Sequence, residues 1–177
     1  MNIDGIECPV GYECPEGNRI ALKCEAGYYC DKPGMARGNK CRPGFFCPEG
    51  TKELTDENIC IFPFYCPSGS SYQQPCPLGD SPLTDNVNRT DLAENCEKCP
   101  EGTYRSNFDQ EECFLCEPGY FCPEGTGDYT ENVCPQGNAC LPGDVNAPSP
   151  CEPGTYAFGT GNSICSECLS NTYSQAV

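Results

Sequence analysis

The chain has 177 residues, and its composition excludes an ordinary globular domain. Leu, Ile, Val and Phe number only 27 and the net charge is −16, values typical of disordered chains, which lack the apolar surface to offset chain entropy. The 19 cysteines change this interpretation, because such a density indicates a scaffold held by disulfides. The strong negative charge also argues against nucleic acid or an anionic membrane as a partner.

The cysteine content indicates an oxidising compartment, since the cytosol keeps thiols reduced. We therefore expect an extracellular or cell-surface location, reached through the secretory pathway. No stretch of 18 apolar residues occurs, so we expect no membrane span in this segment. The start, Met1-Asn2-Ile3-Asp4, lacks the basic and apolar regions of a signal peptide, and the sequence stops soon after Cys168. We interpret the chain as a segment of a longer protein.

One motif recurs along the whole chain: a Cys, two residues, usually Gly, and then an aromatic residue. Its copies follow one another at intervals of 16 to 23 residues, which predicts a repeat architecture. We call the ten copies repeats 1 to 10. They begin at Cys8, Cys24, Cys41, Cys60, Cys76, Cys99, Cys116, Cys134, Cys151 and Cys168.

Each repeat opens with a predicted turn. In CPVG, CPLG, CPEG and CPQG the Pro and Gly positions suit a type I turn, whereas adjacent Pro-Gly in CRPG and CEPG suits a type II turn. Repeat 4 has Pro63 in place of Gly, so its turn must differ. Aromatic pairs that follow the turns are predicted to form short strands packed on the disulfide and the next repeat. These pairs are Tyr28-Tyr29, Phe45-Phe46 and Tyr120-Phe121.

Two cysteine formats divide the chain into four stretches. In the short format a second Cys follows the first after six residues, and in the long format it follows later. Short-format repeats occupy residues 1–75 and 116–150. Long-format repeats occupy residues 76–115, which include an insertion, and residues 151–177, which include the start of an unfinished repeat.

Several disulfide connectivities satisfy these cysteines, and sequence alone does not choose between them. An interlocked scheme joins Cys8 to Cys24, and a shifted scheme joins Cys14 to Cys24 and Cys99 to Cys116. We favour pairing within each repeat, which leaves only Cys168 without a partner. That scheme joins Cys8 to Cys14, Cys24 to Cys30, Cys41 to Cys47, Cys60 to Cys66, Cys76 to Cys96, Cys99 to Cys113, Cys116 to Cys122, Cys134 to Cys140 and Cys151 to Cys165.

The main alternative to disulfide bonds is that some of these cysteines bind zinc. Cys96, Cys99, Cys113 and Cys116 have the spacing of a four-cysteine zinc ribbon. The other 15 cysteines have no such spacing and the chain contains no His, so we favour disulfides here too.

The remaining polar residues predict neither catalysis nor a cofactor. Without His the chain lacks the usual general base near neutral pH. Acidic residues such as Asp56, Glu57 and Asp128 lack the alternating pattern of a calcium loop, so we interpret them as solvated surface. We expect no enzyme activity.

One modification site stands out in the insertion between Cys76 and Cys96. Asn88-Arg89-Thr90 is a complete N-glycosylation sequon, so we predict a glycan on Asn88.

Several segments resemble a known group of modules. CEKCPEGTY at 96–104, closed by CFLC at 113–116, resembles the ephrin-receptor-like cysteine-rich repeat, as does CEPGTY at 151–156 closed by CSEC at 165–168. This group also includes growth-factor-receptor and tumour-necrosis-factor-receptor-like modules. The short format is similar to arrays in Cys-rich surface proteins of protists, including flagellar-hair proteins. The resemblance, which runs from Cys8 to Tyr173, implies an extended extracellular array and says nothing about catalysis.

We therefore predict small disulfide-rich repeats that form an extended rod of irregular loops and short β-hairpins, with essentially no helix. The predicted function is that of an extracellular structural protein, in a cell-surface coat, filament or flagellar-hair-like fibril. Even repeats suggest self-association or binding to sister Cys-rich chains. The alternative is a receptor-like or adhesive ectodomain that binds a ligand.

Overall fold

The computed structural model describes residues 5–84, 89–145, 147–170 and 172. These residues are nearly all loop and turn, held by short two-stranded hairpins and nine disulfides. Helix is limited to the four-residue α1 (Leu92–Asn95) and the 3-10 turns η1 (Asp56–Asn58) and η2 (Tyr129–Glu131). The prediction of small disulfide-rich repeats with short hairpins and essentially no helix is thus confirmed. Within the described segments no helix has the length and apolar character needed to cross a membrane.

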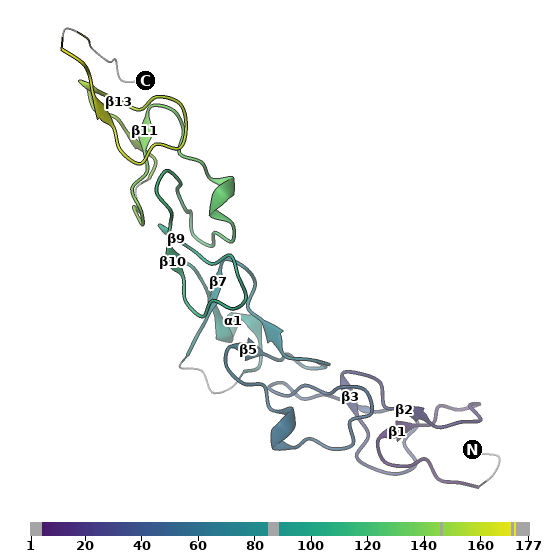
Figure 1. Ribbon diagram of the computed structural model, residues 1–177. Helices are drawn as coiled ribbons and strands as arrows, with labels where there is room; N and C mark the ends of the chain where they lie inside the picture. Colours follow the sequence, from purple (N-terminus) through teal and green to yellow (C-terminus); the bar gives the residue numbers. More distant parts are fainter. Residues whose placement is uncertain (1–4, 85–88, 146, 171, 173–177) are drawn as a thin grey trace. The chain divides into compact units, whose positions relative to one another are not determined.

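The strands form two-stranded sheets, which Figure 1 follows along the chain from purple to yellow. In each hairpin the first strand comes directly after the opening turn, and the second ends just before the first Cys of the next repeat. The hairpins pair β1 (Tyr12–Glu13) with β2 (Leu22–Lys23), β3 (Tyr28–Tyr29) with β4 (Asn39–Lys40), β5 (Phe64–Tyr65) with β6 (Gln74–Pro75), β7 (Asp80–Pro82) with β8 (Cys96–Lys98), β9 (Thr103–Tyr104) with β10 (Phe114–Leu115), β11 (Asn138–Ala139) with β12 (Ser149–Pro150), and β13 (Thr155–Tyr156) with β14 (Ser166–Glu167).

The expectation of strands at the aromatic pairs is correct for one pair and wrong for two. Tyr28 and Tyr29 form β3, but Phe45 and Tyr120 each make a single bridge, to Ile59 and Val133. The difference lies in the returning segments of repeats 3 and 7, which contain η1 and η2. A 3-10 turn leaves too little extended chain for a two-residue ladder.

The predicted type I turns are also wrong. In the CPVG, CPLG, CPEG and CPQG openings the glycine amide donates to the next repeat instead of to its own first Cys, and the glycines have φ between 79 and 88°. In repeat 1 the amide of Tyr12 donates to the carbonyl of Pro9 over 3.1 Å. The turn therefore begins one residue later than expected and places Gly at its third position, as in type II. In repeat 4 the turn differs as predicted, with a cis Phe62–Pro63 bond.

The core consists of cysteines and a few tyrosines rather than of aliphatic side chains. A tyrosine five residues after the first Cys packs against the disulfide of the next repeat. These clusters join Tyr29 with Cys41 and Cys47, Tyr65 with Cys76 and Cys96, and Tyr104 with Cys116 and Cys122. Of the aromatic pairs predicted to pack on the next repeat, only Tyr28-Tyr29 has a member in these clusters, so the expectation is confirmed at Tyr29, whereas Tyr65 and Tyr104 were not predicted.

The chain divides into two compact parts. The N-terminal part comprises Met1–Cys76 and Pro82–Cys96, and the C-terminal part comprises Pro77–Ser81 and Glu97–Val177. Every contact discussed below lies within one of these parts.

Candidate functional site: the junction between repeats

All nine disulfides join the two cysteines of one repeat, as in the within-repeat scheme. Their Cα atoms lie 5.7 to 6.0 Å apart, within the usual range. Six close short loops and three close longer ones, the latter being Cys76–Cys96, Cys99–Cys113 and Cys151–Cys165. In the chain-entropy model a short loop contributes roughly 2 kcal/mol and a long one roughly 3 kcal/mol. Cys168 is a free thiol of intermediate exposure.

The four cysteines with zinc-ribbon spacing belong to three different disulfides. Cys96 is bonded to Cys76, Cys99 to Cys113, and Cys116 to Cys122. None of these sulfurs is therefore a thiolate that could bind zinc. No group of three or more His, Cys, Asp or Glu side chains is placed to hold a metal among the described residues.

The acidic residues considered for calcium lie on separate turns. Asp56 and Glu57 are exposed in η1. Asp128 is the N-cap of η2, and its carboxylate accepts hydrogen bonds from the hydroxyl of Thr130 at 2.6 Å and from the Thr130 amide at 2.9 Å. These two bonds hold the pKa of Asp128 below its usual value. Asp128 thus acts as a cap for a local turn.

The repeats are joined through their backbones at a junction that recurs along the chain. The turn glycine, three residues after the first Cys, donates its amide to the carbonyl of the residue six places after the first Cys of the next repeat. Distances run from 2.8 to 3.2 Å. The pairs are Gly11 with Cys30, Gly27 with Cys47, Gly44 with Cys66, Gly79 with Arg105, Gly102 with Cys122, Gly119 with Cys140 and Gly137 with Ala157.

A second set of bonds returns from the next repeat to the same glycine. The amide of Cys24 donates to the carbonyl of Gly11 over 2.9 Å, and that of Cys116 donates to Gly102 over 2.8 Å. Each of these seven glycines thus both donates to and accepts from the following repeat. Since a backbone hydrogen bond contributes about 0.5–1.5 kcal/mol net, such a junction adds to the local covalent links at these seven steps. Repeat 4 has no amide to donate there, because Pro63 replaces the glycine.

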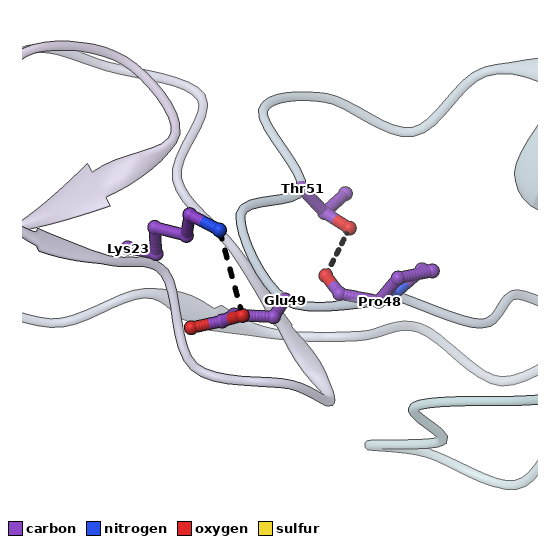
Figure 2. Close-up of polar contacts among 4 residues, drawn as sticks. All are labelled: Lys23, Pro48, Glu49 and Thr51. Atoms are coloured by element: carbon purple, nitrogen blue, oxygen red, sulfur yellow. Dashed lines mark hydrogen bonds and ion pairs between the residues drawn. The ribbon is translucent and has the colours of Figure 1, made fainter.

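A second turn extends the contact between repeats in four short-format repeats, which are repeats 2, 3, 4 and 7. The amide of Gly50, in the tail of repeat 3, donates to the carbonyl of Cys24 over 2.8 Å. Thr51 closes this turn, since its hydroxyl donates to the carbonyl of Pro48 over 2.6 Å. Figure 2 shows this bond beside an ion pair of 3.7 Å between Lys23 and Glu49. The turn connects repeat 3 with the first Cys of repeat 2, and the ion pair connects repeat 3 with β2 of repeat 1.

The tails also reach second neighbours. A Cβ atom added to Gly27 of repeat 2 would lie 2.5 Å from the carbonyl oxygen of Gly69 in repeat 4. A Cβ atom on Gly102 of repeat 6 would lie 2.6 Å from that of Gly143 in repeat 8. Backbone therefore packs directly on backbone, and only Gly fits these turns without displacement.

Arg105 replaces a cysteine at one junction. It lies six residues after Cys99, where short-format repeats have their second Cys, and its side chain is 1% exposed. The guanidinium donates to the carbonyls of Gln110 at 2.6 Å, Asp80 at 2.8 Å and Pro77 at 3.1 Å. Burial lowers the pKa of Arg105, and the charge of Asp80 opposes this shift. Arg105 ties repeat 5 to the tail of repeat 6 by hydrogen bonds.

Arg89 of repeat 5 is a second buried arginine. Its side chain is 5% exposed and lies over the ring of Phe62, with 5.1 Å between the guanidinium carbon and the ring centroid. The amide of Cys66 donates to the Arg89 carbonyl over 2.7 Å, and burial lowers the pKa of Arg89. The predicted glycosylation site, Asn88, lies outside the described residues. Its sequon residue Thr90 donates its hydroxyl to the carboxylate of Glu94 over 2.9 Å.

The C-terminal part has one tyrosine cluster at a junction. Tyr129 of η2 lies between Tyr104 and Tyr120, with ring centroids 4.6 and 5.1 Å apart. Burial raises the pKa of Tyr104, and the charges of Glu117 and Tyr129 raise it further.

Sequence reasoning missed the two buried arginines. For Arg105 a signal was present, because it stands six residues after Cys99, at a position that is otherwise covered by the neighbouring repeat. For Arg89 no comparable signal exists, since the insertion in repeat 5 shifts its position relative to the motif.

No known protein-family profile matches the chain. Among curated proteins, the ABC transporter G family member 25 of Oryza sativa subsp. japonica is similar to it, with 28% identity over 151 residues. The match covers 70% of this chain and 14% of the transporter. The chain thus spans a small fraction of that relative, and the similarity does not assign it to a transporter family.

Proposed function

We propose that the chain is a non-enzymatic structural element of an extracellular assembly, such as a surface coat, a filament or a flagellar-hair-like fibril. In this proposal it binds copies of itself or sister Cys-rich chains. The observation that carries the proposal is the junction described above, in which the same backbone bonds recur from repeat to repeat.

A recurring junction suits a mechanical role. Nine of the ten repeats have their own disulfide, and seven donate a glycine amide to the next repeat, so stability is local and increases with the number of repeats. The nine disulfides fit an oxidising, extracellular environment. Buried side chains are mostly disulfide-bonded cysteines, so the interior consists largely of the disulfide bonds themselves.

Sedimentation of the oxidised chain, made through a secretory pathway, tests this proposal. We expect a weight-average mass that rises with protein concentration above that of the 19.2 kDa monomer. A second series adds extracellular fluid from the native source and measures soluble ligand binding by the immobilised chain. A monomer at all concentrations that binds a soluble ligand at nanomolar affinity would support the receptor-like ectodomain instead.

A further inference from the structure

We propose that the chain associates with a second copy through two charged surfaces, the cationic segment 19–52 of one copy and the acidic segment 97–131 of the other. The inference rests on the proposed self-association and names the surfaces that produce it. The two segments belong to different parts of the chain, so each copy carries both surfaces.

The cationic segment departs from the charge of the rest of the chain. It contains seven basic and three acidic side chains, a local net charge of +4 in a chain of net charge −16. All seven basic side chains are exposed. They are Arg19, Lys23, Lys32, Arg37, Lys40, Arg42 and Lys52.

These cations are largely unused within the chain. Lys23 pairs with Glu49 at 3.7 Å, but the two side chains are 58% and 64% exposed, so this pair contributes little (Figure 2). Arg37 lies over the ring of Tyr28 at 5.3 Å, a contact that leaves its charge exposed. No carboxylate in the described part of the chain lies within ion-pair distance of the other six cations.

The acidic segment carries the opposite charge. It contains nine acidic and two basic side chains, a local net charge of −7, and one of the two bases is the buried Arg105. All nine carboxylates are exposed, and none pairs with a cation among the residues that the structure covers. They belong to Glu97, Glu101, Asp109, Glu111, Glu112, Glu117, Glu124, Asp128 and Glu131.

Each surface also offers apolar side chains among its charges. In the cationic segment Ile20 and Leu22 are 71% and 38% exposed, next to Arg19 and Lys23. In the acidic segment the β10 residues Phe114 and Leu115 are 50% and 65% exposed, close in sequence to four of the carboxylates. Apolar contact within a charged rim is the usual anatomy of a protein interface.

A second copy fits these surfaces because it carries the matching charge and exposed apolar residues on the same chain. Such a contact joins two different surfaces, the cationic segment of one copy and the acidic segment of the other. At a Debye length of about 8 Å in physiological salt, the long-range repulsion between copies is screened while charges in contact still attract. Charge complementarity also speeds encounter.

Two charge-reversal variants and a matched control test the proposal by sedimentation. The first carries Arg19→Glu, Lys32→Glu and Arg42→Glu, which have no side-chain contact on which the fold depends. The second carries Glu111→Lys, Glu112→Lys and Glu124→Lys. The control, with Glu16→Lys, Glu57→Lys and Glu152→Lys, changes net charge as the second variant does, but outside both segments. Circular dichroism and the number of free thiols check that each variant is folded.

We expect the self-association constant of each segment variant alone to fall about tenfold or more, and that of the control to stay close to the native value. Because an equimolar mixture of the two variants retains one native surface of each sign, it should form a complex that stops at the heterodimer. Native association should weaken in about 1 M salt. If both variants assemble like the native chain, or if their mixture stays monomeric, this inference is wrong and the proposed function stands. A native chain that is monomeric under all conditions overturns this inference, and it overturns the proposed function as well if the chain also binds no Cys-rich chain from the native source.

Discussion

The amide of Gly79 donates to the carbonyl of Arg105 over 2.9 Å, in the same way that the amide of Gly102 donates to the carbonyl of Cys122 over 2.8 Å. An arginine and a disulfide-bonded cysteine thus occupy equivalent positions in successive repeats. The backbone junction is the same at both positions, but the acceptor residue is held differently. Cys122 of repeat 7 is held by its disulfide, whereas Arg105 of repeat 6 is held by the hydrogen bonds of its buried guanidinium.

Removing the guanidinium should therefore weaken this junction. We expect Arg105→Met to lower the free energy of unfolding by roughly 2–4 kcal/mol, since several buried carbonyls lose a charged donor. Arg105→Lys should recover part of the loss, because it keeps the charge without the planar fork. The exposed Arg42→Met serves as the control and should change stability by less than about 0.5 kcal/mol. Urea unfolding with intact disulfides, followed by tyrosine fluorescence, measures these differences. Equal stability of Arg105→Met and the native chain would contradict this role.

The backbone contact between Gly27 and Gly69 can be tested with a matched pair of glycine variants. Gly27 and Gly17 have nearly the same φ, 88° and 87°, but a Cβ on Gly27 meets the Gly69 carbonyl, whereas a Cβ on Gly17 meets nothing within 4 Å. Gly17→Ala should cost about 1–2 kcal/mol, the penalty of a left-handed backbone. Gly27→Ala should cost about 1–3 kcal/mol more from overpacking. Urea unfolding of both variants measures the difference, and equal losses would mean that the repeats do not pack as described.

How far the sequence predicts this fold depends on the range of the interaction. The spacing of Cys8, Cys24 and their successors was sufficient for the repeat, the hairpins and the near absence of helix, because these follow from local turn and disulfide chemistry. The turn type was wrong because the hydrogen bond of Gly11 goes to the next repeat, to Cys30, instead of to its own Cys8.

Features that depend on contacts between distant repeats could not be predicted from the sequence. Contacts such as Gly27 with Gly69 involve residues two repeats apart, which no local motif indicates. The burial of Arg105 depends on the path of the tail at 106–110, which the sequence pattern leaves open. The strand expected at Phe45 fails because η1 shortens the returning segment.

The oxidation state of the cysteines is directly measurable. In the native protein we expect iodoacetamide to label Cys168 and no other cysteine, since the remaining 18 are paired. Peptide mapping without reduction should recover Cys99 linked to Cys113. Elemental analysis should find no stoichiometric zinc. Recovery of Cys99 linked to Cys116 would instead support the shifted scheme.

The secretory route predicts a glycan at the sequon of repeat 5. In material from the native source, enzymatic deglycosylation should convert Asn88 to Asp, with the corresponding mass change in its peptide. Thr90→Ala should abolish the modification and Thr90→Ser should retain it, because the sequon requires a hydroxyl at this position. A native peptide with Asn88 mainly unmodified would remove this support for the secretory route.

The central claim, that the chain is a building element of an extracellular assembly, is most directly tested by electron microscopy of surface material from the native source with gold-labelled antibodies against this chain. We predict gold along filaments or across a coat outside the cell, with a regular texture set by the repeats. Gold confined to dispersed single molecules, or to the cell interior, would contradict the claim.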